Sequence, residues 1–126
     1  MRRIHQTRNG ASVALALLLG VSALPAVAQV NPFGKAGGDL SAEDWVAINE
    51  ARDGALADPA AVGASRAWTN PKSGNSGTIA ITGVIQHETM ECRAVEYVFH
   101  FKAQQRSATA QMKECKTADG SWKYLM

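Results

Sequence analysis

The two cysteines, Cys92 and Cys115, are the residues whose chemistry the sequence indicates most directly, because they can form a disulfide. An even number of cysteines in a short chain with an export signal is typical of a structural disulfide. A redox-active pair usually has its cysteines two residues apart at the start of a helix, whereas these two lie far apart in segments with a strand pattern. We predict a structural disulfide, and closing a loop of this size stabilises a fold by about 3 kcal/mol.

A run of titratable residues, His87-Glu88-Thr89-Met90-Glu91, begins like a helical zinc-binding motif. The motif needs a second histidine one helical turn on, where this chain has Glu91 in a segment that is not patterned as a helix. We therefore predict no metal site, no cofactor and no catalytic residues. The enzymatic alternative is a hydrolase of cell-wall polymers, in which His87, Glu88, Glu91 or His100 converge. Two carboxylates about 5 to 9.5 Å apart across a cleft are the signature of glycosidase chemistry.

A polar loop flanked by aromatic residues is the candidate binding site. The segment Thr69–Gly77 is dense in Asn, Pro, Ser and Gly, which favour turns, so we expect an exposed loop. Tryptophan and tyrosine at an exposed site can form a platform for a glycan or a peptide. The alternative is that these aromatics pack in the core, since the chain has few other large core residues. The candidate binding residues are Trp68, Asn70, Lys72, Asn75, Trp122 and Tyr124.

Residues 1–28 have the three parts of a secretory signal peptide: arginines, an apolar run over Ala11–Leu24, and the small-residue cleavage site Ala26-Val27-Ala28. The alternative, an uncleaved membrane anchor, needs about 20 apolar residues, more than this run supplies. We expect cleavage after Ala28, no membrane span after cleavage, and export to the periplasm, the cell surface or the medium. Loss of three arginines changes the formal net charge from +2 to about −1, which removes the support for nucleic-acid binding.

The elements that position these residues follow from spacing. Residues 29–40 are rich in Gly, Pro and Asn, and we expect a flexible leader before a single domain over 41–126. Ser41 can cap a helix over Ala42–Ala57, and Leu40 and Trp45 occupy the positions of a hydrophobic staple. The apolar face of this helix is narrow, so one surface must cover it.

The remaining segments predict strands joined by short turns. In the segment Cys92–Lys102 the apolar residues alternate with polar ones, which indicates a half-buried strand. Gly83 predicts a bulge within its strand. Sequential strands with short links pair antiparallel, so we predict an α+β fold: one N-terminal helix packed on a four- to five-stranded antiparallel meander sheet, with a small open β-barrel as the alternative. The expected strands are Ala64–Trp68, Thr78–Gln86, Cys92–Lys102, Ser107–Lys116 and Ser121–Leu125.

The segments Trp68–Thr78, Glu91-Cys92-Arg93 and Cys115–Trp122 resemble the C-terminal domain of the bacterial 17-kilodalton surface antigen family. That domain has a similar series of tryptophan, Asn-Pro, Ser-Gly and Gly-Thr, then Cys-Arg, and a closing cysteine followed by Asp-Gly-x-Trp. The resemblance covers about Ala64–Tyr124. The lipid-attachment cysteine and the Gly-rich repeat that members often carry are missing, and Lys116 stands where the family often has arginine. The resemblance implies an envelope protein and no particular active site.

Together these observations favour a non-enzymatic, disulfide-stapled protein of the cell envelope that binds an envelope protein or a glycan. Besides the hydrolase, a third interpretation is a periplasmic inhibitor or assembly subunit that lends a sheet edge to a partner. A concave pocket with perturbed carboxylates would favour the hydrolase, and a bare strand edge would favour the third interpretation. The sequence favours no particular oligomeric state.

Overall fold

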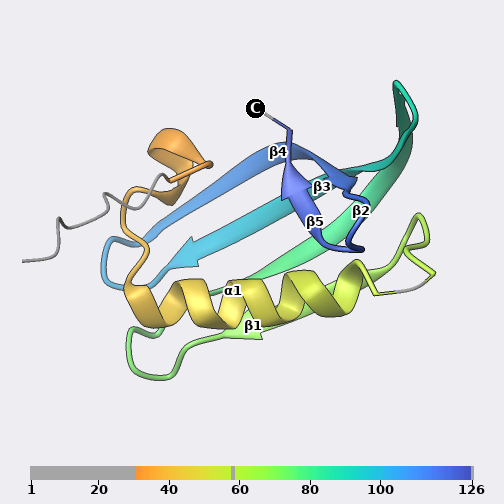
Figure 1. Ribbon diagram of the computed structural model, residues 1–126. Helices are drawn as coiled ribbons and strands as arrows, with labels where there is room; N and C mark the ends of the chain where they lie inside the picture. The colour runs from red at the N-terminus through yellow and green to blue at the C-terminus, as the bar shows by residue number, and fades with distance from the viewer. Residues whose placement is uncertain (1–30, 58, 126) are drawn as a thin grey trace, which may run out of the picture.

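The structure is a computed structural model that describes residues 31–57 and 59–125 (Figure 1). The predicted signal peptide over residues 1–28 lies outside this range. The described elements are the 3₁₀-helix η1 (Gly34–Gly37), the helix α1 (Ala42–Ala55) and the strands β1 (Ser65–Thr69), β2 (Ser76–His87), β3 (Met90–Phe101), β4 (Arg106–Lys116) and β5 (Trp122–Tyr124).

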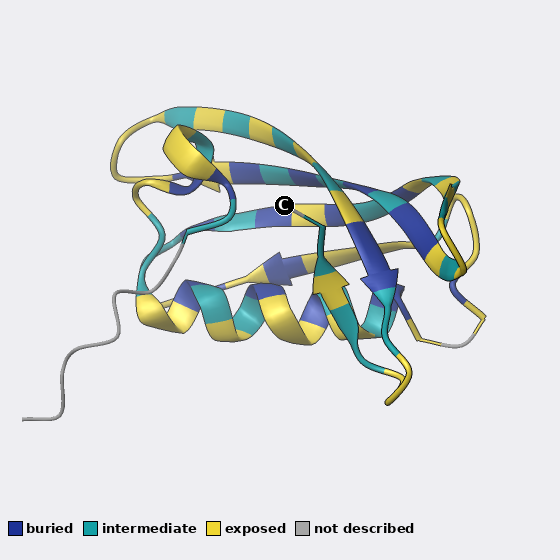
Figure 2. Ribbon diagram, turned by 45° about the horizontal axis from the view of Figure 1, so that its top comes forward, coloured by how far each residue is buried: buried dark blue, intermediate teal, exposed yellow. Residues whose placement is uncertain are grey.

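The five strands form one antiparallel sheet in the order β1-β2-β3-β4-β5, which is the predicted meander. The sheet curls around α1 as a half-barrel, so that the helix lies between the two ends of the sheet, β1 and β5 (Figures 1 and 2). The α+β prediction is confirmed. The sheet does not close into a barrel, since β1 and β5 are its two edges.

Helix α1 begins where the sequence predicts. The Ser41 hydroxyl accepts a hydrogen bond from the Asp44 N–H at 3.1 Å, and the Asp44 carboxylate accepts one from the Ser41 N–H at 3.0 Å, which together form a capping box. The helix ends at Ala55, two residues before the predicted end. Leu56 is the C-cap, where its N–H donates to the Arg52 carbonyl and its side chain is buried in the core.

Strand β2 carries the predicted bulge, since its register with β3 shifts between Ile81 and Gly83. The strand begins earlier than predicted, because Ser76 and Gly77 pair with the end of β1. A β-carbon on Gly77 would lie 1.8 Å from the Val98 carbonyl oxygen, so only glycine allows the two strands to approach this closely. The predicted loop Thr69–Gly77 is therefore shorter and spans residues 70–75.

The core lies between α1 and the concave face of the sheet (Figure 2). The alternation predicted for β3 is confirmed, because its apolar residues face the helix and His100 faces solvent. From the helix side Ile48 is fully buried. The residues of β3 that fill the core are Val95, Tyr97, Phe99 and Phe101.

Residues 31–40 differ from the flexible leader expected over 29–40, because they fold against the sheet. The Phe33 ring is buried, stacks on Trp45 at 5.2 Å between ring centroids and contacts Tyr97 at 4.6 Å. The Asn31 side chain holds this turn by accepting from the Phe33 N–H and donating to the Gly37 carbonyl. One aromatic residue in a Gly-rich segment is enough to anchor it, although the segment has no apolar periodicity.

Within residues 31–57 and 59–125, no helix combines the length and the apolar character needed to cross a membrane.

Candidate functional site

The two cysteines lie directly opposite each other on β3 and β4 and form the predicted disulfide. Both are buried, and β5 pairs with β4 beside Cys115. The bond therefore joins β3 to β4 at the end of β4 that pairs with β5. Because both residues are almost fully buried, the bond has the position of a structural disulfide rather than of a catalytic one.

Three polar residues of the loop 70–75 form hydrogen bonds to a buried carboxylate. The Asp44 side chain, fully buried at the start of α1, accepts hydrogen bonds from Asn70 at 2.8 Å, Ser73 at 2.7 Å and Asn75 at 2.8 Å. Burial alone would raise the pKa of Asp44, but these donors and the Ser41 N–H hold the pKa below its usual value. Asn70 and Asn75, predicted as binding residues, are thus buried structural groups that fix the loop to the helix.

The predicted aromatic platform is not assembled. Trp68 is buried against Phe99, as the core alternative predicts. Trp122 and Tyr124 are half-buried on β5. Because α1 lies between β5 and β1, these two side chains do not share a surface with Trp68. Lys72 is exposed on the loop, where it forms an ion pair with Glu43 at 3.2 Å.

A second buried carboxylate, which the sequence reasoning missed, joins the helix to the far end of the sheet. Glu114 of β4 is fully buried, forms an ion pair with Arg52 of α1 and accepts a hydrogen bond from the Tyr97 hydroxyl at 2.7 Å. Arg52 also donates to the Trp122 carbonyl on β5 at 2.7 Å. Burial, and secondarily the Glu114 charge, raises the pKa of Tyr97, so its hydroxyl stays a donor. The alternation of side chains along β4 places Glu114 on the concave face, and this pattern in the sequence could have predicted its burial.

Of the residues that a hydrolase would require, His100 lies far from the other three. His87 and Glu88 lie at the turn between β2 and β3, whereas His100 lies ten residues along β3, about 30 Å away by the rise of a strand. His100 is hydrogen-bonded to Ser107, and Glu91 forms an ion pair with Arg93. In the described part of the chain, no three His, Cys, Asp or Glu side chains are grouped so that they could hold a metal ion.

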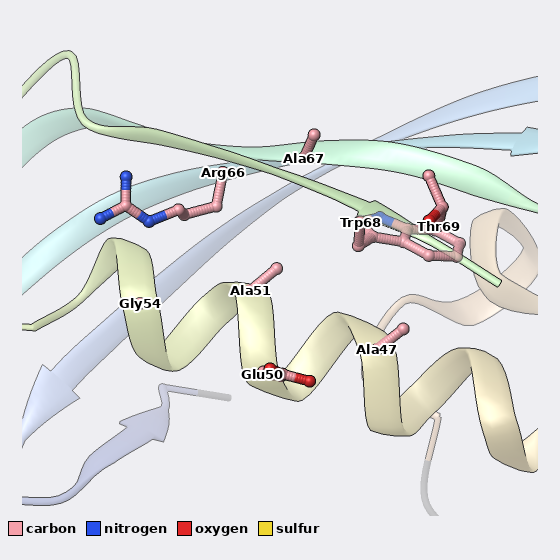
Figure 3. Close-up of a pocket in the computed structure, with 8 residues that line it drawn as sticks. All are labelled: Ala47, Glu50, Ala51, Gly54, Arg66, Ala67, Trp68 and Thr69. Atoms are coloured by element: carbon pink, nitrogen blue, oxygen red, sulfur yellow. The ribbon is translucent and has the colours of Figure 1, made fainter.

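A groove of about 380 Å³ runs between α1 and β1 (Figure 3). The helix presents mainly small side chains to it at a spacing of three or four residues, which leaves room beside the strand. Arg66 lies along the groove over Gly54, and Glu50 lies on the opposite rim, pointing away from β1. The lining residues are Ala47, Glu50, Ala51 and Gly54 of α1 and Arg66, Ala67, Trp68 and Thr69 of β1.

The outer edge of β1 adds free backbone groups to this groove. The hydrogen bonds from Ile81 N–H to the Ala64 carbonyl and from Asn70 N–H to the Asn75 carbonyl show which residues face β2. In an antiparallel pair alternate residues face the partner strand, so Ser65, Ala67 and Thr69 direct their N–H and C=O groups away from β2. β1 is therefore a sheet edge whose outward donors and acceptors have no backbone partner in the described part of the chain.

A second hollow, of about 470 Å³, lies between the end of α1 and β5. Its lining includes the cations Arg52, Lys116 and Lys123. Arg52 is already bound to Glu114, so the most buried charge of this hollow is neutralised. The groove at β1 is the better candidate site, because there both the backbone groups and a guanidinium are unoccupied by other elements of residues 31–57 and 59–125.

The fold and the groove define a small α+β half-barrel protein with a bare strand edge beside its helix. Comparison of the chain with protein-family models, with curated proteins and with solved structures found no match. The resemblance to the 17-kilodalton surface antigen family stays a prediction. Several residues on which the resemblance rests have structural roles in this chain: Asn70, Ser73 and Asn75 bind Asp44, and Gly77 allows close strand pairing.

Proposed function

We propose that this protein is an exported, non-enzymatic binding module of the cell envelope, which holds an extended segment of another envelope protein along the free edge of β1. The observation that carries the proposal is the row of outward-facing backbone groups at Ser65, Ala67 and Thr69, beside a groove floored by small helix side chains. Among these groups only the Ser65 carbonyl has a contact, at 3.5 Å from the Arg66 guanidinium. Extended peptides bind such edges by adding a strand, and main-chain hydrogen bonds supply the affinity.

The sequence supports the envelope as the location. The predicted signal peptide directs export, and a buried disulfide is typical of proteins that fold in an oxidising compartment. The resemblance to the 17-kilodalton surface antigen family points to the same place. A mature chain of slightly negative charge favours a protein partner over a nucleic acid.

The dimensions of the groove suit a strand. An added strand would lie about 4.8 Å from β1 and would continue the curl of the sheet over α1. Ala47, Ala51 and Gly54 present no large side chain to block it. The loop 70–75 is a weaker candidate surface, because its Asn70 and Asn75 amides are already bound to Asp44.

The test uses a library of random, unstructured peptides selected on the exported, oxidised protein. Ala67→Pro removes an N–H that faces away from β2, so the substitution blocks strand addition without breaking a hydrogen bond of the sheet. The matched control is Thr109→Pro on β4. The bond from the Leu125 N–H to the Lys113 carbonyl shows that Thr109 also directs its N–H outward, beyond the stretch that β5 covers.

We expect selected peptides to bind the wild type and Thr109→Pro equally and to lose at least tenfold in affinity for Ala67→Pro, since several main-chain hydrogen bonds are lost together. Circular dichroism and the melting temperature report that both variants are folded. Recovery of no peptide, or of peptides that bind Ala67→Pro as well as the wild type, would show that the edge of β1 is not the binding element.

A further inference from the structure

We infer that the segment bound along β1 carries an acidic side chain directly opposite Arg66. This inference rests on the proposed function and specifies the chemistry of the partner. It comes from one cation in the groove, Arg66, whose charge no other described residue neutralises.

Arg66 is exposed, and no acidic side chain of residues 31–57 and 59–125 lies within ion-pair distance of it. Its guanidinium has only a long contact, 3.5 Å, to the carbonyl of the neighbouring Ser65. The side chain rests on the helix, because a β-carbon at Gly54 would lie only 3.2 Å from Arg66 Nε. The arginine side chain therefore packs against the helix at Gly54, but the helix supplies no acidic partner for it.

The position of Arg66 on β1 determines which residue of a partner it meets. Arg66 and Trp68 are two residues apart, so they lie on the same face of the strand, and Trp68 is buried toward α1. The residue of an added strand opposite Arg66 points to that same face, with its β-carbon about 5 Å from that of Arg66. Opposite charges at such a cross-strand pair are favourable, and like charges are unfavourable.

Glu50 is the one acidic residue among those that line the groove. It lies one helical turn before Gly54, and its side chain points away from β1. Arg66 is therefore the charged side chain of the groove that an added strand would meet, so an acidic residue is favoured opposite it.

The experiment compares three nine-residue peptide mixtures, with uncharged residues at every position except the central one, which is Glu, Gln or Lys. Their affinities for the oxidised, exported protein are measured by fluorescence polarisation. We expect the Glu mixture to bind about fivefold more tightly than the Gln mixture, the size expected of an exposed ion pair, and the Lys mixture to bind least tightly. The preference for Glu should weaken as the salt concentration rises.

Charge variants assign the effect to one side chain. Arg66→Gln should abolish the preference for Glu, and Arg66→Glu should reverse it in favour of Lys. The matched control Glu50→Gln should keep it. Equal binding of the three mixtures to the wild type, or a preference that survives Arg66→Gln, would overturn the inference while leaving the proposed function standing. Failure of all three mixtures to bind, or equal binding to Ala67→Pro, would overturn both.

Discussion

Asp44 shows how one carboxylate can organise a loop that is distant in sequence. The capping role of Ser41 was predicted, because a cap depends only on neighbouring residues. The three side-chain donors that reach Asp44 from Asn70, Ser73 and Asn75 were not predicted, because their approach depends on the tertiary fold. Polar residues in a Gly- and Pro-rich stretch indicate a loop, but they do not reveal whether their side chains face solvent or a buried charge.

The lowered pKa of Asp44 makes stability depend on pH. A carboxylate whose pKa is lower in the folded than in the unfolded protein stabilises the fold above the unfolded value, about 3.9, and this contribution is lost as the pH falls through the folded value. We expect the melting temperature to decrease when the pH is lowered below about 4. In Asp44→Asn the protein should be less stable at pH 7 and should lose less on acidification. An unchanged pH profile in this variant would contradict the role of Asp44.

Gly77 is predicted to be irreplaceable. Gly77→Ala would place a methyl group against the Val98 carbonyl and the Trp68 ring, so β2 would have to move away from β3. We expect a loss of about 3 kcal/mol or more in the free energy of unfolding, measured by urea denaturation. The control is Gly83→Ala, whose β-carbon would meet nothing closer than 3.6 Å, and which should cost less than about 1 kcal/mol.

At the scale of elements, the strands were predicted well and the short N-terminal segment was not. β3 and the bulge of β2 followed from alternation and from Gly83, both of which are local signals. The 3₁₀-helix η1 has no periodicity, and it is held in place by Phe33, whose contacts come from α1 and β3. The candidate groove could not be predicted, because it depends on how α1 is seated beside β1.

The ion pair between Arg52 and Glu114 holds α1 against β4 and β5. Glu114→Ala should cost about 3 to 5 kcal/mol, because it leaves the Arg52 guanidinium and the Tyr97 hydroxyl without their buried acceptor. Replacement of both charges, Arg52→Met with Glu114→Leu, should cost less than Glu114→Ala alone. Urea denaturation of Arg52→Met, Glu114→Leu and the double variant measures the coupling. Additive losses would show that the two side chains do not act as a pair.

For the whole molecule, the disulfide is the largest single constraint on the unfolded chain. Replacement of Cys92 and Cys115 together by serine should lower the free energy of unfolding by about 3 kcal/mol, and the cost rises if the buried hydroxyls lack acceptors. The melting temperature with and without a reductant checks the same quantity in the unaltered chain. The α+β architecture was predictable from the order of the elements, whereas the curl of the sheet follows from the burial of β3 against α1 and Phe33.

The contact between Phe33 and Tyr124 brings the two ends of the described chain together in space, with 6.0 Å between their ring centroids. The ends are therefore close enough to be joined covalently, so the fold does not depend on where the chain begins. A circular permutant that joins the described ends by a short Gly-Ser linker, and that opens the chain at the exposed β3–β4 turn between Gln104 and Gln105, should fold to the same half-barrel. In such a permutant the native ends would no longer be available as attachment points, while the groove at β1 would be unaltered.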